Sequence, residues 1–579
     1  MTDGTTPRGM RKGLTRYGDE GFSLFLRKAF IKAMGFSDDA LDRPIVGIAD
    51  TGSDYNACHA NVPRLVEAVK RGVMLAGGLP MAFPTISLHE SFSHPTSMFL
   101  RNLMAMDTEE MIRAQPMDAV VLIGGCDKTI PAQLMAAASA DVPALVLPTG
   151  PMMTGHYRGE RLGACTDCRR FWGMYRAGEL DDAEIEDVND RLAPTAGTCM
   201  VMGTASTMAC MTEALGMMLP GGATIPAVHA DRERFAERTG RRAVGIAAED
   251  LRPERIMTPD AFHNALVTLQ GIGGSTNGLV HITAVAGRLG LGIDLDAFDA
   301  IGRQVPVLVD LKPSGDYYME HLHDAGGLNA VLRELRADLR TGAPTVSGRT
   351  LGENIELGDR VPGQTVVRTR SDPIHPSGGM AVLRGNLAPD GAVIKHSAAS
   401  PRLLAHTGRA VVFDSLEDLA ARVDDPDLDV APEDVLVLRG AGPKGAPGMP
   451  EAGYIPIPKK LAARGVKDMV RLSDARMSGT AFGTIVLHVT PESATGGPLA
   501  LVETGDRIRL DVGARRLDLL VPEEEIAARQ ERWSPPPPHS GSERGYLRLF
   551  LETVTGADRG CDFDFMGRSG ASVRPAPEP

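Results

Sequence analysis

The chain has 579 residues, of which 43% are hydrophobic and 23% charged, with a formal net charge of -13 and a pI near 5.6. This length exceeds what one hydrophobic core usually supports, so we expect at least two domains. The acidic balance excludes a protein that binds nucleic acid or an anionic membrane surface through a basic face.

Neither a secretory signal nor a membrane span is expected. The first 22 residues carry basic side chains but no apolar segment of the signal-peptide kind. The longest apolar runs, such as AVVLIGG and VPALVLP, are far shorter than the roughly 20 residues of a membrane helix. Seven cysteines, an odd number without a dense framework, are typical of a reducing cytosol. We therefore expect a cytoplasmic protein whose cysteines are free thiols or metal ligands.

The first half of the chain alternates short apolar runs with helix-like stretches. Strands are expected over residues 44–49, 119–123 and 142–147, and helices over residues 62–76 and about 130–140. This alternation predicts parallel βαβ units in a doubly wound α/β sheet with helices on both faces. In such sheets ligands gather beyond the carboxyl ends of the strands.

After about residue 365 the pattern changes to short strand candidates separated by Gly, Pro and Asp turns. Their density predicts a β-barrel or a sandwich. We place the linker in the RSDPIHPSGG stretch, which gives an N-terminal α/β domain over residues 1–369 and a C-terminal β-barrel-like domain over residues 370–579. A proline-rich stretch at 534–542 predicts an extended connection to a short terminal helix.

Three cysteines lie on separate loops rich in small or turn-forming residues. Cys58 follows the first expected strand in SDYNACHANV, and Cys126 follows the second in GGCDKT. Cys199 lies in PTAGTCMVMGTAST, ahead of an apolar stretch over residues 200–219 that is expected to be helical. The three thiols could converge on one metal centre. For each of them, a buried cysteine that acts as a small apolar side chain is the alternative.

Cys165 and Cys168 form a C-x-x-C pair in GACTDCRR, a spacing that often signals zinc or redox chemistry. No second C-x-x-C or H-x-x-H pair follows at zinc-finger distance, so a structural or incidental role is favoured. As zinc ligands these two cysteines would suit a zinc-dependent hydrolase, which is a competing hypothesis. Cys210 and Cys561 are solitary and are not expected to be ligands.

Ligands for a hard cation are also available on loops. Asp127 follows Cys126 directly, Glu90 lies in SLHESFSHPTS, and Glu451 lies in the Gly/Pro-rich GPKGAPGMPEAG. Magnesium typically uses few carboxylates and completes its coordination with substrate and water. A solvated surface carboxylate is the alternative for each acid.

Two further loops carry small hydroxyl side chains. Ser478 and Thr480 lie in SDARMSGTAFG, where a serine could also serve as a helix N-cap. Ser275 lies in GIGGSTNG, which lacks the ending of a Walker motif and is better interpreted as backbone amides that line a pocket. Thr480 and Ser275 are weak candidates for a substrate pocket. The chain has no G-x-S-x-G elbow, so a serine hydrolase is not supported.

Six motifs follow one another along the chain: GGCDKT, TAGTCMVMGTASTMACMTEALGM, GGSTN, PSGGMAVLRGNLAPDGAVIK, GPKGAPGMPE and SDARMSGTAFG. Together they resemble the dihydroxy-acid dehydratase and 6-phosphogluconate dehydratase family, from about residue 16 to residue 566. The resemblance implies an N-terminal α/β domain, a C-terminal β-barrel-like domain and an active site between them. It also implies an iron–sulfur cluster, 2Fe-2S in the sugar-acid branch, a magnesium ion, and a homodimer or homotetramer.

Carried over residue by residue, the resemblance assigns the cluster to three cysteines: Cys58, Cys126 and Cys199. It assigns the magnesium ion to three acids: Glu90, Asp127 and Glu451. Lys128 matches a lysine that is carbamylated in relatives, which would turn its amine into a further hard oxygen ligand. Ser478 matches the serine proposed as the catalytic base. One short loop, GGCDKT, would then contact two metal centres of opposite softness.

The reaction that the resemblance implies is the dehydration of a 2,3-dihydroxy acid. Magnesium would stabilise the negative charge that builds up when the C2 proton is removed. An iron with an open position would accept the C3 hydroxide, and Ser478 would act as an alkoxide base near the metal. Tautomerisation then yields a 2-keto-3-deoxy acid.

The motifs also bear on the substrate. HES and AGTC stand where branched-chain relatives tend to show DDG and CGSC, which resembles the sugar-acid dehydratases. We therefore expect a small-molecule aldonate such as xylonate, arabinonate or galactonate. The alternative within the family is a dihydroxy-acid dehydratase of branched-chain amino-acid biosynthesis. 6-Phosphogluconate dehydratase is less favoured, because no Arg/Lys cluster for a phosphate stands out.

A zinc hydrolase and a non-catalytic sugar-acid sensor are the alternatives from other classes. Cys165 and Cys168 depart from the pattern expected for the family.

Overall fold

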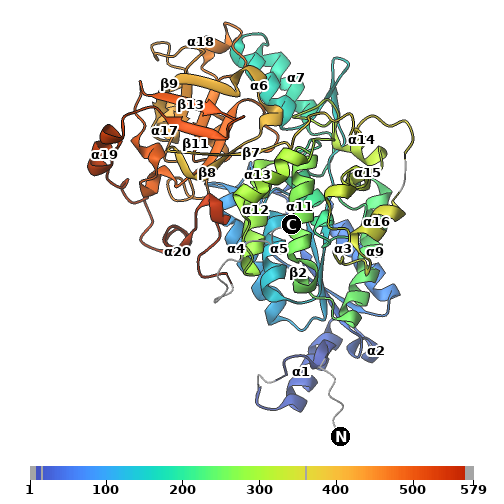
Figure 1. Ribbon diagram of the computed structural model, residues 1–579. Helices are drawn as coiled ribbons and strands as arrows, with labels where there is room; N and C mark the ends of the chain where they lie inside the picture. The colour runs from blue at the N-terminus through green and yellow to red at the C-terminus, as the bar shows by residue number, and fades with distance from the viewer. Residues whose placement is uncertain (1–7, 15–16, 359–360, 568–579) are drawn as a thin grey trace.

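The computed structural model describes residues 8–14, 17–358 and 361–567 of the chain. Within them, a parallel four-stranded sheet lies in the N-terminal half and a closed eight-stranded barrel in the C-terminal half (Figure 1). This confirms the predicted fold class, an α/β sheet followed by a β-barrel-like unit.

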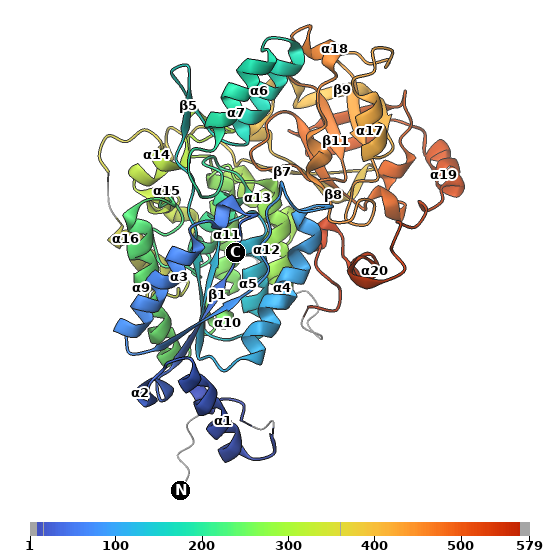
Figure 2. The ribbon, with the colours of Figure 1, turned by 180° about the vertical axis from the view of Figure 1, so that it is seen from behind.

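The parallel sheet has four strands: β1 (Ile45–Asp50), β2 (Leu79–Pro84), β3 (Ala119–Gly124) and β4 (Ala144–Pro148). They lie in the order β2-β1-β3-β4, and every neighbouring pair is parallel. Figure 2 shows α3 (Val62–Leu75) and α9 (Ala230–Glu249) on one side of the sheet and α4 (Ser97–Ala114) and α5 (Thr129–Ala140) on the other. With both faces covered, strands β1, β3 and β4 are apolar at almost every position, as parallel sheets require.

Most predicted elements of the first half lie within two residues of the observed ones, but two differ. The apolar stretch over residues 200–219 is helical only at α8 (Thr204–Ala214), since a turn precedes Gly203 and Gly216 adopts a φ of +84° beyond the helix. Strand β2 was not predicted, because its sequence, LPMAFP, contains two prolines. Its place at the edge of the sheet tolerates them.

The remaining helices surround these two β structures. They are α1 (Glu20–Ala33), α2 (Asp38–Leu41), α6 (Thr166–Ala177), α7 (Asp182–Leu192), α10 (Pro253–Ile256), α11 (Pro259–Gly271), α12 (Thr276–Arg288), α13 (Leu295–Gln304), α14 (Met319–Asp324), α15 (Gly327–Glu334), α16 (Leu351–Leu357), α17 (Leu416–Arg422), α18 (Lys459–Ala462), α19 (Glu523–Arg532) and α20 (Gly545–Thr553). A short hairpin, β5 (Gly155–Tyr157) and β6 (Glu160–Leu162), precedes α6. None of the helices in the described part of the chain combines the length and the apolar composition that crossing a bilayer requires.

The barrel is built from the eight strands after residue 380: β7 (Ala381–Gly385), β8 (Ala388–Ile394), β9 (Ala405–Phe413), β10 (Val435–Leu438), β11 (Val470–Ser473), β12 (Ile485–Thr490), β13 (Arg507–Asp511) and β14 (Arg516–Leu519). They close in the order β10-β11-β12-β8-β7-β14-β13-β9 around a core of Val, Leu and Ile side chains. Strand β11 was not predicted. It is short and carries a charge, Arg471, which is buried because Asp468 accepts its hydrogen bond over 2.8 Å.

Polar contacts join the barrel to the α/β part. Gln270, in helix α11, accepts a hydrogen bond from the backbone N–H of Met380 over 3.0 Å. Arg515, after β13, donates to both carboxylate oxygens of Asp299 in α13, over 2.7 and 3.1 Å. These contacts fix the barrel against helices α11 and α13 of the α/β part.

Candidate active site

The candidate site begins at the carboxyl ends of the parallel strands. The loops after β1, β2 and β3 supply four predicted site residues: Cys58, Glu90, Cys126 and Asp127. Strands β1 and β3 are neighbours, but the chain leaves them towards opposite edges of the sheet. Such a switch point opens a crevice in which open α/β sheets bind their ligands.

The three predicted cluster cysteines approach one another there. The Sγ atoms of Cys58 and Cys126 and a ring nitrogen of His89 lie within 4.8 Å of one another. Cys199 comes from a later loop, and its neighbour Thr198 pairs with the chain just after β4. The hydrogen bond with Cys126, burial and the nearby Cys199 thiol all raise the pKa of Cys58. Thiols gathered in this way are typical ligands of iron or zinc.

His59 holds the first two cysteine loops together and was not predicted from the sequence. Its Nε2 accepts a hydrogen bond from the backbone N–H of Gly125 over 3.0 Å, and its Nδ1 lies 2.9 Å from the carbonyl oxygen of Thr51. Burial lowers the pKa of His59 to about 4, so the ring is neutral and its one proton sits on Nδ1. The ring thereby fixes the loop of Cys58 to the loop of Cys126.

The C-x-x-C pair, expected to be structural or incidental, lies against this group. Cys165 is the N-cap residue of α6, and its Sγ is 3.1 Å from the Sγ of Cys199. Cys168 follows in the first turn of the helix and is half-buried. Cys210 and Cys561 are buried in apolar clusters elsewhere.

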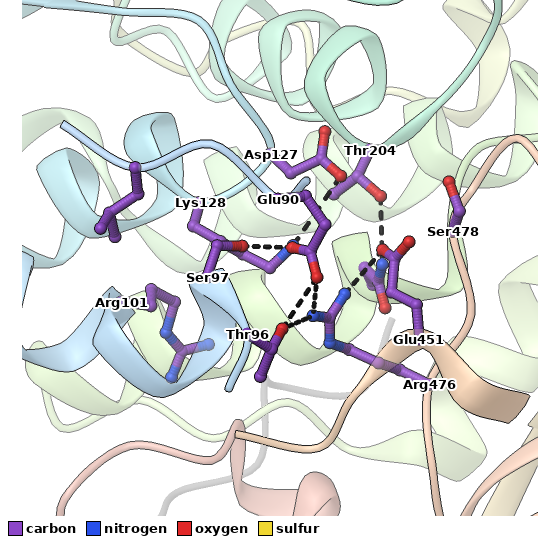
Figure 3. A network of polar contacts seen from close by, with 12 residues as sticks. Glu90, Thr96, Ser97, Arg101, Asp127, Lys128, Thr204, Glu451, Arg476 and Ser478 are labelled. Carbon is purple, nitrogen blue, oxygen red and sulfur yellow. Dashed lines mark hydrogen bonds and ion pairs between the residues drawn. The ribbon is translucent and has the colours of Figure 1, made fainter. Parts of the chain in front are cut away.

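The three predicted magnesium ligands also meet. Carboxylate oxygens of Glu90, Asp127 and Glu451 lie within 4.8 Å of one another (Figure 3). Glu90 and Asp127 come from the sheet edge, whereas Glu451 comes from the barrel loop between β10 and β11. The group therefore spans the junction between the α/β part and the barrel, and its donors are those that a hard cation prefers.

Two buried cations lie among these carboxylates. Arg476, on the barrel loop after β11, donates to Glu451 over 2.7 Å and to Glu90 over 2.8 Å. Lys128 places its Nζ 3.2 Å from Glu90 and 3.8 Å from Asp127. The side chains of Arg476 and Lys128 are 1% and 0% exposed, so the charges must be balanced inside the site (Figure 3).

The acids respond differently to this environment. Burial opposes the ionisation of Glu90, but Arg476 and Lys128 hold its pKa well below its usual range. Hydrogen bonds from Thr96 and Ser97 act in the same direction. Burial and the charge of Glu90 instead raise the pKa of Glu451. Glu90 is thus firmly ionised, whereas ionisation of Glu451 is opposed by desolvation and by repulsion from Glu90.

Ser478 lies on the same barrel loop as Arg476 and is 6% exposed. Its Oγ is 2.8 Å from Oγ1 of Thr480. Thr480 in turn accepts a hydrogen bond from Nη1 of Arg169, in helix α6, over 2.9 Å. Since the arginine donates to this hydroxyl, the proton of Thr480 is free to point at Ser478. The three side chains form a chain of hydrogen bonds that ends on the serine.

Ser275 has a structural place beside this turn. Its Oγ caps α12 by accepting from the backbone N–H of Asn277 over 3.2 Å, and it lies 2.9 Å from the hydroxyl of Thr204. A Cβ added at Gly479 would lie 2.5 Å from this Oγ, so the turn between Ser478 and Thr480 packs directly on Ser275. Ser275 is fully buried, and its assignment to a substrate pocket stays a prediction.

Sequence reasoning did not single out two buried cations near this turn, Arg476 and Lys395. Lys395 follows β8, and its Nζ lies 3.5 Å from the carbonyl oxygen of Gly479. Burial lowers the pKa of Lys395 to about 7. Arg476 lies in SDARMSGTAFG and Lys395 ends GAVIK, both of which are motifs noted above. A basic residue among small or apolar neighbours is the feature of the sequence that could have indicated each of them.

Comparison with known proteins agrees with this geometry. The family model described as Dihydroxy-acid/6-phosphogluconate dehydratase N-terminal matches residues 43–354, and the corresponding C-terminal model matches residues 365–561. Together the two matches cover the parallel sheet, the barrel and every candidate residue described above.

Individual relatives match over almost the whole chain. The L-arabinonate dehydratase of Rhizobium leguminosarum bv. trifolii (strain WSM2304) is 47% identical over 560 residues, 95% of either protein. The L-arabonate dehydratase of Azospirillum brasilense is 46% identical over 566 residues, 96% of this chain and 97% of that protein. The dihydroxy-acid dehydratase of Moorella thermoacetica (strain ATCC 39073 / JCM 9320) is 41% identical over 541 residues, 92% and 97% of the two. The chain therefore belongs to the dihydroxy-acid/6-phosphogluconate dehydratase family of lyases.

Proposed function

We propose that this dehydratase acts on a sugar acid, an aldonate such as arabinonate, xylonate or galactonate, and forms the 2-keto-3-deoxy acid. The observation that carries the proposal is the division of one loop between two groups. Cys126 joins the thiols, and Asp127 joins the carboxylates of Glu90 and Glu451. The names of the arabinonate and arabonate dehydratases at 46–47% identity support the sugar-acid class.

The donor sets fit the groups that such a dehydratase needs. The thiols of Cys58, Cys126 and Cys199 suit a 2Fe-2S cluster, whose usual ligands are cysteine thiolates. The carboxylates of the acid group suit Mg²⁺, which leaves room for substrate and water. Lys128, buried between two of these carboxylates, would add a further oxygen ligand once its amine carries a carbamate.

When bound, Mg²⁺ supplies Lewis-acid stabilisation of the negative charge on the substrate carboxylate, and the cluster supplies an acceptor for the departing hydroxide. Ser478 removes the proton at C2, and its alkoxide is stabilised by the hydrogen bond from Thr480. Arg169 favours that direction by donating to the Thr480 oxygen, which leaves the Thr480 proton available for Ser478. The resulting enol then becomes the keto acid.

Arg476 holds the carboxylates of Glu90 and Glu451 in position while the reaction proceeds. Its two terminal nitrogens bind Glu451 and Glu90, which come from different parts of the fold. A planar guanidinium can hold two carboxylates at a fixed angle, which a lysine cannot do. Arg476 is itself buried and the acids are half-buried, and this low exposure to solvent strengthens each of these interactions.

The test is turnover by anaerobically purified protein with Mg²⁺ over a substrate panel. The panel contains arabinonate, xylonate, galactonate, gluconate, 6-phosphogluconate and 2,3-dihydroxyisovalerate, and the readout is 2-keto acid. We expect turnover of one or more aldonates with little activity on the isovalerate.

A second candidate function is the branched-chain dihydroxy-acid dehydratase, which the 41% identical relative from Moorella supports. It uses the same chemistry on an apolar substrate, and a preference for the isovalerate in the panel would establish it instead. The comparisons give the zinc hydrolase no support.

A further inference from the structure

We propose that Cys165 is a fourth thiolate ligand of the iron–sulfur cluster, on the iron that Cys199 would hold, when no substrate is bound. This inference rests on the proposed function, since it requires the cluster. It concerns the C-x-x-C pair, a motif for which neither the fold nor the dehydratase chemistry gives a role.

The thiols lie in two pairs. Cys58 and Cys126 form one pair, with their Sγ atoms within 4.8 Å of each other. Cys199 and Cys165 form the other, with Sγ atoms 3.1 Å apart. Two sulfurs bound to one tetrahedral metal over bonds of about 2.3 Å lie roughly 3.8 Å apart. A small side-chain rotation converts the second pair to that spacing, and a cluster of two irons with cysteine ligands takes two thiolates on each iron.

The backbone of Cys165 is held in a strained conformation that presents its side chain. Its φ is 79° and its ψ is -38°, a region that non-glycine residues rarely occupy. Arg169 donates to its carbonyl oxygen over 2.6 Å, and Asp167 accepts from the backbone N–H of Gly163 over 2.7 Å. Lys312 in turn binds the buried carboxylate of Asp167 over 2.9 Å. Strain of this kind persists only where surrounding contacts enforce it, and it gathers at functional sites.

The same turn contacts the catalytic loop. Thr166, next to Cys165, donates its hydroxyl to the carbonyl oxygen of Thr480 over 2.9 Å. Arg169, one turn further, reaches the Thr480 hydroxyl. Cys165 therefore lies between Cys199 on one side and the loop of Ser478 on the other, where a bound substrate would lie. A hydroxyl of the substrate can displace the thiolate: the bond from iron to the Cys165 sulfur breaks, a bond from iron to the hydroxyl oxygen forms, and the proton of that hydroxyl passes to the sulfur. No electrons are transferred.

Such a ligand would close the second iron in the resting enzyme. An iron with an open position is exposed to oxidants, whereas full cysteine ligation shields it. The two cysteines of the C-x-x-C pair would then differ in role, because Cys165 and not Cys168 is the ligand that the substrate displaces. Cys165 contacts Cys199, whereas the hydrogen bond of the Cys168 thiol is with Cys165.

The experiment compares the full-length wild-type protein with three variants, all purified without oxygen: Cys165→Ser, Cys165→Gly and the matched control Cys168→Ser. Glycine tolerates the positive φ of residue 165, so Cys165→Gly removes the thiol without added backbone strain. Iron and acid-labile sulfide are measured first, and Mössbauer spectra of the oxidised proteins follow. Loss of the cluster on exposure to air is then timed.

We expect every protein to contain a cluster and the two irons of the wild type to be alike. One iron should become distinct in both Cys165 variants but not in Cys168→Ser. Saturating substrate should make one iron of the wild type distinct as well, and the Cys165 variants should lose their clusters in air severalfold faster.

The proposal is overturned if the Cys165 variants keep the wild-type spectrum and lifetime, if Cys168→Ser alone changes them, or if the wild-type protein with its cluster shows a Cys165–Cys199 disulfide. A wild-type protein without iron and sulfide would instead refute the proposed function, so the two failures are distinguishable.

Discussion

Cys126 and Asp127 are consecutive residues whose side chains belong to different groups. The Sγ of Cys126 lies within 4.8 Å of the Sγ of Cys58, and a carboxylate oxygen of Asp127 lies within the same distance of Glu90 and Glu451. The loop between β3 and α5 is short and tightly held, because His59 accepts from the backbone of Gly125. A soft and a hard donor are thereby fixed side by side, as the proposed iron–sulfur cluster and magnesium ion would require.

Removal of the Arg476 guanidinium should destabilise the fold. Arg476→Gln leaves the half-buried Glu90 and Glu451 without their shared partner, and loss of one member of a buried ion pair costs up to about 3–5 kcal/mol. Denaturant unfolding of the protein without added metal measures the free energy of unfolding. Arg548→Gln is the control, since it removes an exposed pair with Glu552 and should change stability little. Equal effects of the two variants would refute the role of Arg476.

Thr480 should control the pH dependence of turnover. Thr480→Val keeps the shape of the side chain but removes the hydroxyl that lies 2.8 Å from Ser478 Oγ. A serine alkoxide without that hydrogen bond is harder to form, so the pH at which kcat rises should move upward.

Ser478→Ala should retain both metals and lose turnover by roughly 10²–10⁴-fold, the usual contribution of a general base. For Thr480→Val, an unchanged pH profile of kcat would contradict the chain of hydrogen bonds from Arg169 through Thr480 to Ser478.

Carbamylation of Lys128 can be tested by its dependence on CO₂. Protein stripped of metal and bicarbonate should bind Mg²⁺ weakly, and bicarbonate should restore both binding and turnover. Lys128→Ala should be inactive with bicarbonate but partly rescued by a short carboxylate such as acetate. Lys128→Met, which fills the same space, should not be rescued. Full activity in rigorously CO₂-free buffer would show that the lysine acts as an amine.

A pH-dependent stability is expected from Glu492, which accepts backbone hydrogen bonds from Lys444 and Gly445 in the loop that leads to Glu451. Burial, assisted by Asp474, raises the pKa of Glu492 to about 7. A group whose pKa is higher in the folded state binds more protons there, so its contribution to stability is complete below the unfolded pKa of about 4.5 and is lost as the pH rises through 7.

Glu492→Gln removes this titration. The melting temperature of the variant should therefore gain on that of the wild type as the pH rises from 4.5 to 7. The gain corresponds to a change of roughly 3 kcal/mol in the difference between their free energies of unfolding. All other titrating groups are common to both proteins and cancel in the difference. A difference that does not change with pH would mean that Glu492 is not buried as a titrating acid.

The sequence predicted those parts of the molecule that depend on local pattern. The strand before GGCDKT and the helix after it are visible as an apolar run followed by a helical period, which places Cys126 and Asp127 at a sheet edge. The other barrel strands could be predicted as short apolar runs between turn residues. Strand β11 could not, because its buried Arg471 breaks the apolar pattern.

Contacts between distant segments could not be predicted in this way. Arg476 binds Glu90 across 386 residues of chain, and Cys165 contacts Cys199 at the start of α6, which is also anchored to the barrel loop at Thr480. Nothing in the spacing of either pair reveals the contact. Motif resemblance indicated which residues belong to one site, and the tertiary structure shows how the buried cations and His59 hold them there.

The measurement that tests the central claim most directly is metal analysis of two adjacent variants, Cys126→Ser and Asp127→Asn, each purified without oxygen. If one loop serves two metal groups, Cys126→Ser should lose iron and sulfide. Asp127→Asn should retain both yet lose Mg²⁺ binding and turnover. Retention of the cluster in Cys126→Ser, or equal loss of iron from both variants, would contradict the division of the loop between the two groups.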